Sequence, residues 1–248
     1  METQPKSDTP RQQAVHEEIM HRVAGDGRFA WVEVEAKVGL KAIARVDRGV
    51  RSGSPVLLLL ENESIPQYMW PAAAPFAQWI IRHRSLFEGK RVLELGSGVG
   101  FAGFSAAAAG ASTVVFSDCS PVSRALVELA ILENAAALRT LGTRCLFQSL
   151  RWGSIEQLEQ LRQQTGIAAF DVVIGCDVFY FNSSLRNGIL TAKEALVPGG
   201  DFCCGSVVRS DRMEADIDDV PMELGLRLSC KEEEGPLLVY HWNTERDD

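Results

Sequence analysis

Three glycines stand at alternate positions between an apolar run and an alanine-rich run, in the order Gly96-Ser-Gly-Val-Gly100. The apolar run Arg91–Leu95 is short and predicts a buried strand, and the run Phe101–Ala109 predicts a helix. Glycine tolerates positive φ and lets a ligand approach the backbone closely. The first turn of a helix also offers backbone N–H groups without partners. This unit therefore predicts a site for a nucleoside-containing ligand.

Acidic residues accompany three predicted strands. Glu94 lies within the first apolar run, Asp118 ends the β-branched run that begins at Thr113, and Asp177 ends the apolar run that begins at Phe170. Because parallel strands end at the same edge of a sheet, we expect the three carboxyl groups on one rim. A carboxylate at the position of Asp118 suits hydrogen bonds from the hydroxyl groups of a ribose.

Two cofactors compete for the glycine unit. Gly98-Val-Gly100-Phe-Ala-Gly103 matches the G-x-G-x-x-G pattern of nicotinamide dinucleotide sites, but it begins two residues late, because Gly96 already ends the strand. Asp118 lies 15 residues after Gly103, whereas that pattern places its acid about 20 residues on. S-adenosylmethionine has no pyrophosphate and needs only a glycine bend. A tight turn without a ligand is the third interpretation, and three glycines followed by an acid argue against it.

The stretch Val92–Gly100 resembles motif I of the seven-strand methyltransferases, which use S-adenosylmethionine. The resemblance implies that Glu94 lies near the methionine end of the cofactor and that Asp118 binds the ribose. It also implies S-adenosylhomocysteine as the product. S-adenosylmethionine is therefore the cofactor that we predict.

Three further stretches are similar to motifs of the lysine-methyltransferase group within that family. Asp177-Val-Phe-Tyr180 resembles the D-x-x-Tyr motif after the fourth strand, Trp70-Pro-Ala72 the tryptophan-proline-alanine element, and Leu150-Arg-Trp152 the tryptophan after the third strand. With motif I they extend over about residues 68–208, in the order of the family. Within the group, the chain looks most like methyltransferase-like protein twenty-three, followed by the elongation-factor-2 lysine methyltransferases.

The resemblance assigns the site residues. The tryptophans border the cofactor, and the residue before the D-x-x-Tyr motif lies beside the adenine. The predicted cofactor-binding residues are Trp70, Glu94, Gly96, Ser97, Gly98, Gly100, Asp118, Trp152 and Cys176. The predicted catalytic residues are Asp177, which orients the acceptor nitrogen, and Tyr180, whose aromatic face forms the wall of the acceptor channel. No metal ligand is predicted, because no two cysteines have C-x-x-C spacing.

We predict methyl transfer to a lysine side-chain amine of a protein. An arginine acceptor is the rival, because the resemblance to methyltransferase-like protein twenty-three implies a histone arginine. A guanidinium is bound best by a bidentate carboxylate, often by more than one acid. Asp177 is the one acid in the segment after the fourth predicted strand, which favours lysine as the acceptor. The alternative from another class of function is an interaction module that binds the cofactor without catalysis. Without the flanking motifs, Trp70 and Trp152 would be interpreted as core aromatics. For Asp118 and Asp177, capping of the helix that follows is the alternative role, and the preceding glycine turn argues against it for Asp118.

Alternating predicted strands and helices indicate an α/β fold, a Rossmann-like doubly wound sheet of seven mostly parallel strands that ends in an antiparallel C-terminal hairpin. We expect a disordered tail over residues 1–13, an N-terminal extension with a β-hairpin over residues 14–65, and the methyltransferase domain over residues 66–248.

Inside these parts, residues 14–23 predict a short helix. Alternating apolar and polar residues over 29–36 predict a strand, and residues 56–60 predict its partner. A long amphipathic helix is expected over residues 122–138.

The composition limits the partners and the compartment. The 248 residues carry a net charge of −8, and residues 211–248, with twelve acidic residues and four Lys or Arg, account for all of it. This charge disfavours a nucleic-acid partner and suits a basic protein substrate. The first twenty residues show no signal peptide and no apolar run approaches the roughly 18 residues of a membrane span. We therefore expect a protein of the cytoplasm, with the nucleus as a second compartment, and reduced cysteines. We also expect a monomer, although no feature of the sequence determines the oligomeric state.

Overall fold

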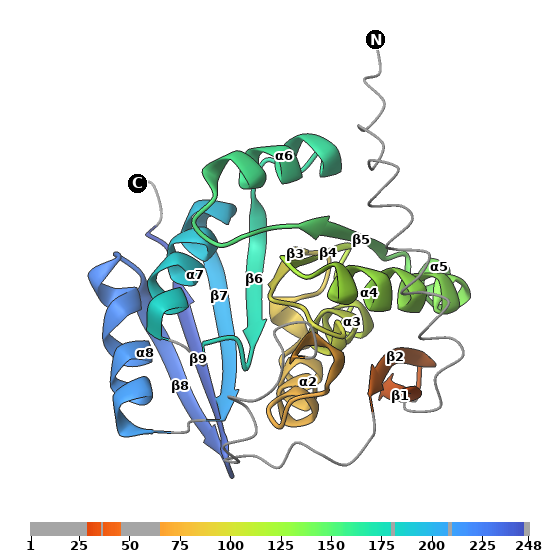
Figure 1. Cartoon of the computed structure of the whole chain (residues 1–248), viewed down its shortest axis with the longest axis horizontal. Helices are drawn as coiled ribbons and strands as arrows, with labels where there is room; N and C mark the ends of the chain where they lie inside the picture. Colours follow the sequence, from red (N-terminus) through yellow and green to blue (C-terminus); the bar gives the residue numbers. More distant parts are fainter. Residues whose placement is uncertain (1–28, 36, 46–64, 180–181, 208–209, 246–248) are drawn as a thin grey trace.

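The computed structural model describes residues 29–35, 37–45, 65–179, 182–207 and 210–245, and it is centred on one seven-stranded sheet (Figure 1). The strands stand in the order β5-β4-β3-β6-β7-β9-β8. The first five are mutually parallel, and β9 is antiparallel to both β7 and β8. The bounds are β3 Arg91–Leu95, β4 Thr113–Asp118, β5 Arg144–Ser149, β6 Phe170–Cys176, β7 Leu196–Val207, β8 Arg227–Glu234 and β9 Leu237–Asn243. The predicted fold class is confirmed.

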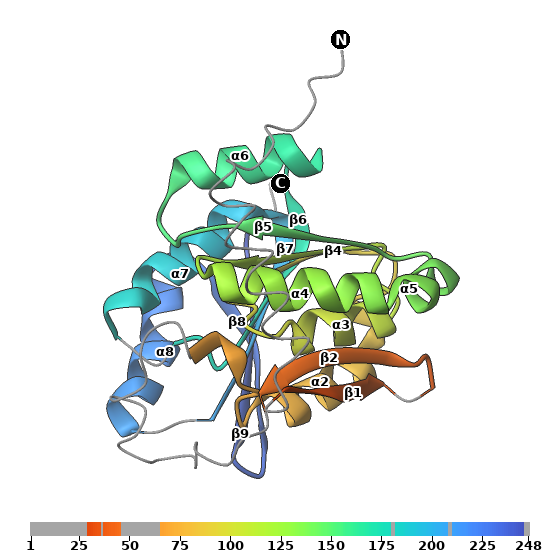
Figure 2. The same ribbon diagram turned by 45° about the vertical axis from the view of Figure 1, so that its right-hand side comes forward.

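Helices cover both faces of this sheet (Figure 2). Their bounds are α2 Ala73–Arg82, α3 Phe101–Ala108, α4 Pro121–Glu133, α5 Ala135–Leu141, α6 Ile155–Thr165, α7 Asn182–Ala195 and α8 Asp211–Glu223. Neighbouring residues of a strand point to opposite faces. Val92 therefore joins the core under α2, α3 and α4, whereas Leu93 joins the core under α6, α7 and α8. Because both faces are covered, the central strands carry apolar residues in succession, such as Val114, Val115 and Phe116 in β4.

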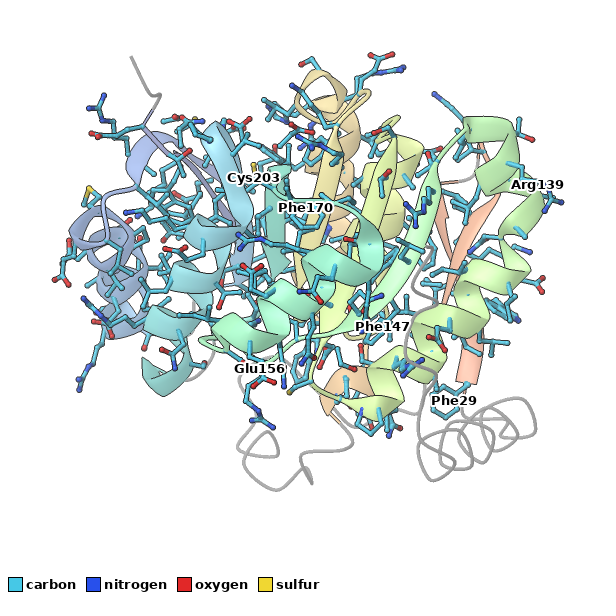
Figure 3. The ribbon with its side chains drawn as sticks, turned by 90° about the horizontal axis from the view of Figure 1, so that it is seen from above. Phe29, Arg139, Phe147, Glu156, Phe170 and Cys203 are labelled. Carbon is cyan, nitrogen blue, oxygen red and sulfur yellow. The ribbon has the colours of Figure 1, made fainter. Side chains whose placement is uncertain are left out.

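The sheet itself forms the middle of the hydrophobic core. In the view from above, Phe170 and Cys203 lie inside the molecule on the adjacent strands β6 and β7 (Figure 3). Both side chains are fully buried. Arg139 on α5 and Glu156 on α6 are exposed at the periphery. The strand ends are thereby held by packing on both sides, which gives the loops that follow them fixed starting points.

The topology places a ligand site at the ends of β3 and β6. The chain runs outward from β3 through β4 to β5, and then returns to β6 on the other side of β3. β3 and β6 are direct neighbours, with Val92 paired to Val172. In open α/β sheets, ligands bind beyond the carboxyl ends of the strands at this switch point. The loops that follow Leu95 and Cys176 are therefore the ones expected to hold a ligand.

A two-stranded antiparallel hairpin, β1 (Phe29–Glu35) and β2 (Leu40–Arg45), packs against α3 and α4. This pairing corrects the prediction that residues 56–60 are the partner of the first strand. Alanine has low β-propensity, so the sequence of β2, which contains Ala42 and Ala44, did not predict a strand. Residues 56–60, the predicted tail over 1–13 and the predicted helix over 14–23 lie outside the described residues.

The long helix predicted over residues 122–138 is divided into α4 and α5 at Asn134. The side chain of Asn134 pairs with the backbone of Lys41 in β2: its Oδ1 accepts the Lys41 N–H at 3.0 Å, and its Nδ2 donates to the Lys41 carbonyl at 2.6 Å. The break therefore ties the N-terminal hairpin to the helices that cover the sheet. None of the helices in the described ranges is both long and apolar enough to span a membrane.

Candidate active site

The turn after β3 has a left-handed backbone at each of its glycines. The angle φ is 61° at Gly96, 51° at Gly98 and 76° at Gly100, a region that glycine enters without steric cost. The Ser97 N–H donates to the Ser117 carbonyl at 2.9 Å, which anchors the turn on β4. Helix α3 starts directly after the turn, so the unpaired N–H groups of its first turn lie at this edge of the sheet.

Asp118, the last residue of β4, contacts the turn directly. Its Oδ2 accepts the Gly98 N–H at 3.0 Å, and its Oδ1 accepts the Ser120 N–H at 2.9 Å. The residue is half-buried. Burial raises the pKa of this carboxyl group, and the two N–H donors oppose the rise. Helix α4 is capped by the side chain of Ser120, so the carboxyl group of Asp118 serves the turn and not the helix cap.

Glu94 lies on β3 beneath α3 and is 2% exposed. Its Oε2 has no hydrogen-bond partner within the described ranges. Burial raises the pKa of Glu94 well above its ordinary value; the Gly103 N–H opposes the rise, and the charge of Asp118 adds to it. A Cβ atom at Gly103 would lie only 2.5 Å from this oxygen. The packing of α3 on β3 therefore explains the third glycine of the G-x-G-x-x-G match, whatever the ligand.

Side chains from other segments enclose the turn. A Cβ atom at Gly96 would lie 2.9 Å from Cγ1 of Val178 and 3.1 Å from Cζ2 of Trp152, and one at Gly98 would lie 3.4 Å from the Pro66 carbonyl oxygen. The loops after β6 and β5 and the segment before α2 thus meet at the turn. The contacts of Pro66 and Val178 were not predicted, because an apolar residue in a loop carries no recognisable chemical signal.

The other predicted cofactor residues lie on these same segments. Trp152 is half-buried, and its ring centroid is 5.8 Å from that of Phe179 in the loop after β6. Trp70 is half-buried in the segment that leads into α2. Cys176 is half-buried at the end of β6, where it pairs with Gly205 of β7. Their binding of the cofactor stays a prediction, and their positions are compatible with it.

Of the two predicted catalytic residues, the structure describes Asp177 but not Tyr180. Asp177 follows β6 and is 3% exposed. Its Oδ1 accepts the Val207 N–H at 3.1 Å, and its Oδ2 accepts the Ala72 N–H at 3.2 Å. Tyr180 lies outside the described residues, so its place in the wall of the channel stays a prediction.

Two serines form hydrogen bonds at the turn that were not predicted from the sequence. The Ser123 Oγ donates to the Gly98 carbonyl at 2.7 Å, and the Ser117 Oγ donates to the Glu94 carbonyl at 2.7 Å. Both residues are buried. Serine next to proline, as in Ser120-Pro121, marks a helix start, which locates this region but does not reveal hydrogen bonds back to the turn.

The residues around the turn fit S-adenosylmethionine. The half-buried carboxyl group of Asp118 suits ribose hydroxyls, and the unpartnered Oε2 of Glu94 suits a donor or a positive group. The apolar surfaces of Val178 and Trp152 suit a purine or a thioether. In the described ranges, no group of three or more His, Cys, Asp or Glu residues is placed to hold a metal ion.

The strand order, the glycine turn at the switch point and the acid after the next strand define a Rossmann-like S-adenosylmethionine-dependent methyltransferase. The sequence matches the model of the lysine methyltransferase family over residues 57–215. The chain belongs to this family, and the predicted family and cofactor are confirmed. The matched region includes the glycine turn, both tryptophans and the loop after β6.

Two groups of relatives differ in the acceptor that their names state. The chain is 29% identical to the histone-arginine methyltransferase METTL23 of Xenopus laevis over 148 residues, which cover 58% of each chain. It is 34% identical to the calmodulin-lysine N-methyltransferase of Arabidopsis thaliana over 128 residues, which cover 51% of this chain and 40% of that protein. The match thus spans about half the length of these relatives.

Solved structures share the fold at low sequence identity. The magnesium protoporphyrin IX methyltransferase of Synechocystis PCC 6803, solved with S-adenosylmethionine bound, has a TM-score of 0.54 and 15% identity, covering 97% of this chain and all of that one (100%). An O-methyltransferase family protein of Burkholderia thailandensis has a TM-score of 0.57 and 15% identity, covering 96% of this chain and 71% of that one. These likenesses establish the architecture.

Proposed function

We propose that this protein transfers a methyl group from S-adenosylmethionine to a lysine side-chain amine of a protein substrate. The observation that carries the proposal is the match to the lysine methyltransferase model over residues 57–215, which includes the whole candidate site. The relative named for calmodulin lysine supports the same acceptor.

S-adenosylmethionine supplies a methyl group that its sulfonium already makes electrophilic. The protein has to hold the nucleoside, align the acceptor and exclude water. The turn from Gly96 to Gly100 and the carboxyl group of Asp118 serve the first task. A lysine amine has a reference pKa of about 10.4, and an apolar environment favours its neutral, nucleophilic form. Val178 and Phe179, which are buried, provide apolar surface next to the turn.

The charges near β6 and β7 favour lysine over arginine. A guanidinium is bound best by a carboxylate that accepts two parallel hydrogen bonds. Asp177 is the single acid in residues 177–184 and 205–210, and each of its oxygens already accepts a backbone N–H. Arginine remains the second candidate, because the METTL23 relatives are named for it.

The proposal extends to the partner and its compartment. A net charge of −8, all of it from residues 211–248, attracts a basic protein over a distance of about one Debye length. We propose that a monomer modifies such a protein in the cytoplasm or the nucleus. Methylation rates of a basic acceptor should then fall several-fold between about 50 and 500 mM salt, whereas those of a neutral acceptor should change little.

The test is labelling followed by identification of the modified side chain. The protein is incubated with a cell extract and tritiated S-adenosylmethionine, and labelled proteins are hydrolysed to amino acids and analysed by mass spectrometry. We expect methyl-lysine, which disappears with Gly96→Ala, a variant designed to block the cofactor turn. Methylarginine would replace the proposal by its rival. Cofactor binding without any labelled protein would favour the non-catalytic interaction module.

A further inference from the structure

The carboxylate of Asp177 joins three separate parts of the chain. Its Oδ2 accepts the N–H of Ala72, just before α2, at 3.2 Å, and its Oδ1 accepts the N–H of Val207, the last residue of β7, at 3.1 Å. The Asp177 N–H donates to the Gly205 carbonyl at 2.8 Å and continues the pairing of β6 with β7. Ala72 and Val207 are 105 and 30 residues away in sequence, so this is a tertiary arrangement.

The burial of Asp177 argues against direct contact with the acceptor. A group that orients the acceptor nitrogen has to face the pocket that the acceptor enters, and such a pocket is open to water before the acceptor binds. Asp177 is 3% exposed, and Ala72 on its Oδ2 side is fully buried. The oxygens of the carboxylate are directed at backbone N–H groups, which are the donors that a buried carboxylate needs.

The backbone of Asp177 turns the chain back towards the cofactor site. Its φ of 53° makes it the single non-glycine residue with positive φ in the described ranges, and aspartate and asparagine are among the residues that tolerate this region best. The next residue, Val178, lies against Gly96, and the ring of Phe179 lies beside that of Trp152. The position of Asp177 therefore sets the position of the wall that faces the glycine turn.

We propose that Asp177 is a positioning residue for methyl transfer. Its carboxylate clamps the start of α2 and the end of β7 to the loop after β6, and this clamp fixes Val178 and the segment that contains Trp70 around the cofactor. This role replaces the predicted contact with the acceptor nitrogen. The inference rests on methyl transfer at this site, but not on whether the acceptor is lysine or arginine.

Asp177→Asn tests the clamp. Asparagine keeps the shape of the side chain and tolerates positive φ, but it replaces one acceptor oxygen with an NH₂ donor. Either Ala72 or Val207 then loses the acceptor of its N–H. We expect the Kd for S-adenosylhomocysteine to rise at least tenfold and amide hydrogen exchange at Ala72 or Val207 to accelerate. At saturating cofactor, the pH dependence of kcat should keep its shape.

Asp171→Asn is the matched control. Asp171 lies at the other end of β6, and its carboxylate also accepts a backbone N–H from a neighbouring strand, that of Arg91 at 2.8 Å, together with the Arg91 side chain. Loss of this carboxylate weakens the sheet far from the glycine turn. The control should therefore lower the melting temperature and leave the Kd for S-adenosylhomocysteine within about twofold of the wild-type value.

The proposal is overturned if Asp177→Asn binds S-adenosylhomocysteine like the wild type while kcat falls with an altered pH profile, because that pattern belongs to a residue that touches the acceptor. Should this variant not fold, hydrogen exchange of the cofactor-free wild type decides. The amides of Ala72 and Val207 should be protected to the same degree as amides inside β7, such as that of Cys204, and rapid exchange at both would refute the clamp. The Kd and the hydrogen-exchange readouts need no methylated acceptor, so they can fail or succeed separately from the proposed function, whereas the kcat readout requires an acceptor.

Discussion

The glycine turn has no room for a side chain at position 96. In Gly96→Ala, the new Cβ lies 2.9 Å from the Cγ1 of Val178 in a backbone with φ of 61°, and a left-handed conformation costs alanine roughly 1–2 kcal/mol. The loop after β6 has to move to accept it. We expect the Kd for S-adenosylhomocysteine, measured by calorimetry, to rise more than tenfold.

Gly142→Ala separates the effect of backbone strain from that of the contact. Gly142 has φ of 69°, but no atom of the described residues lies within 4 Å of the position that a Cβ would occupy there. This variant should lose about 1 kcal/mol of unfolding free energy and keep its cofactor affinity. Equal loss of affinity in the two variants would mean that general destabilisation, and not closure of the turn, weakens binding.

The burial of Glu94 makes the stability of the folded protein depend on pH. In the unfolded chain this carboxyl group ionises near its ordinary pKa of 4.5, whereas burial keeps it protonated to higher pH in the folded protein. The folded state then binds more protons, so its stability falls as the pH rises from about 4.5 through the raised pKa. Glu94→Gln removes this ionisation. Its gain in melting temperature should be small at pH 4 and larger at pH 7, where it corresponds to about 1–3 kcal/mol.

The resemblance to motif I implies that Glu94 lies near the methionine end of the cofactor, so the same variant should bind S-adenosylmethionine more weakly. Glu88→Gln is the control: its side chain is exposed in an ion pair with Arg84, and its effect on the melting temperature should be small at both pH values. A gain for Glu94→Gln that is equal at pH 4 and pH 7 would show that ionisation of Glu94 is not the cause.

What the sequence reveals about single residues depends on how local their contacts are. Gly96, Gly98 and Asp118 were predicted because a turn and the next strand bring them together within 23 residues. The contacts of Asp177 with Ala72 and Val207 depend on how three distant segments pack. The resemblance to a motif located this residue, but spacing along the chain cannot tell which atoms its carboxylate binds.

At the scale of elements, the strands of the sheet centre were the easiest to predict. β3, β4 and β6 are covered on both faces, so the residues at their centres, such as Leu93, Val115 and Val173, are apolar. β2 was missed because its alanines have low β-propensity. The break between α4 and α5 was missed for another reason. The side chain of Asn134 pairs with the backbone of Lys41, 93 residues away, and this tertiary contact overrides the local helical pattern.

Asn134→Ala should loosen the N-terminal hairpin from the helices. The substitution removes the hydrogen bonds to the Lys41 N–H and carbonyl, which are partly buried, and a backbone group that loses its partner away from water costs about 1–3 kcal/mol. We expect the unfolding free energy to fall by about 2 kcal/mol and the Lys41 amide to exchange faster. Thr140→Ala on α5 loses one exposed hydrogen bond within its helix and should change neither quantity much. An unchanged exchange rate at Lys41 would contradict this account of the hairpin.

The melting temperature of the whole molecule distinguishes between the two cofactors, S-adenosylmethionine and a nicotinamide dinucleotide, that the glycine pattern allows. A ligand that binds only the folded state at 100 times its Kd adds about 2.7 kcal/mol of stability, or roughly 5–10 °C in the melting temperature of a domain of this size. S-adenosylhomocysteine should raise the melting temperature by this amount in the wild type and Gly142→Ala, and by no more than about half as much in Gly96→Ala, whose Kd is expected to be more than tenfold higher. NAD should raise none of them, because the packing of α3 on β3 accounts for Gly103, the third glycine of the dinucleotide pattern, without a pyrophosphate. Stabilisation by NAD alone would mean that the turn holds a pyrophosphate, and the assignment of the cofactor, together with the methyl transfer built on it, would have to be abandoned.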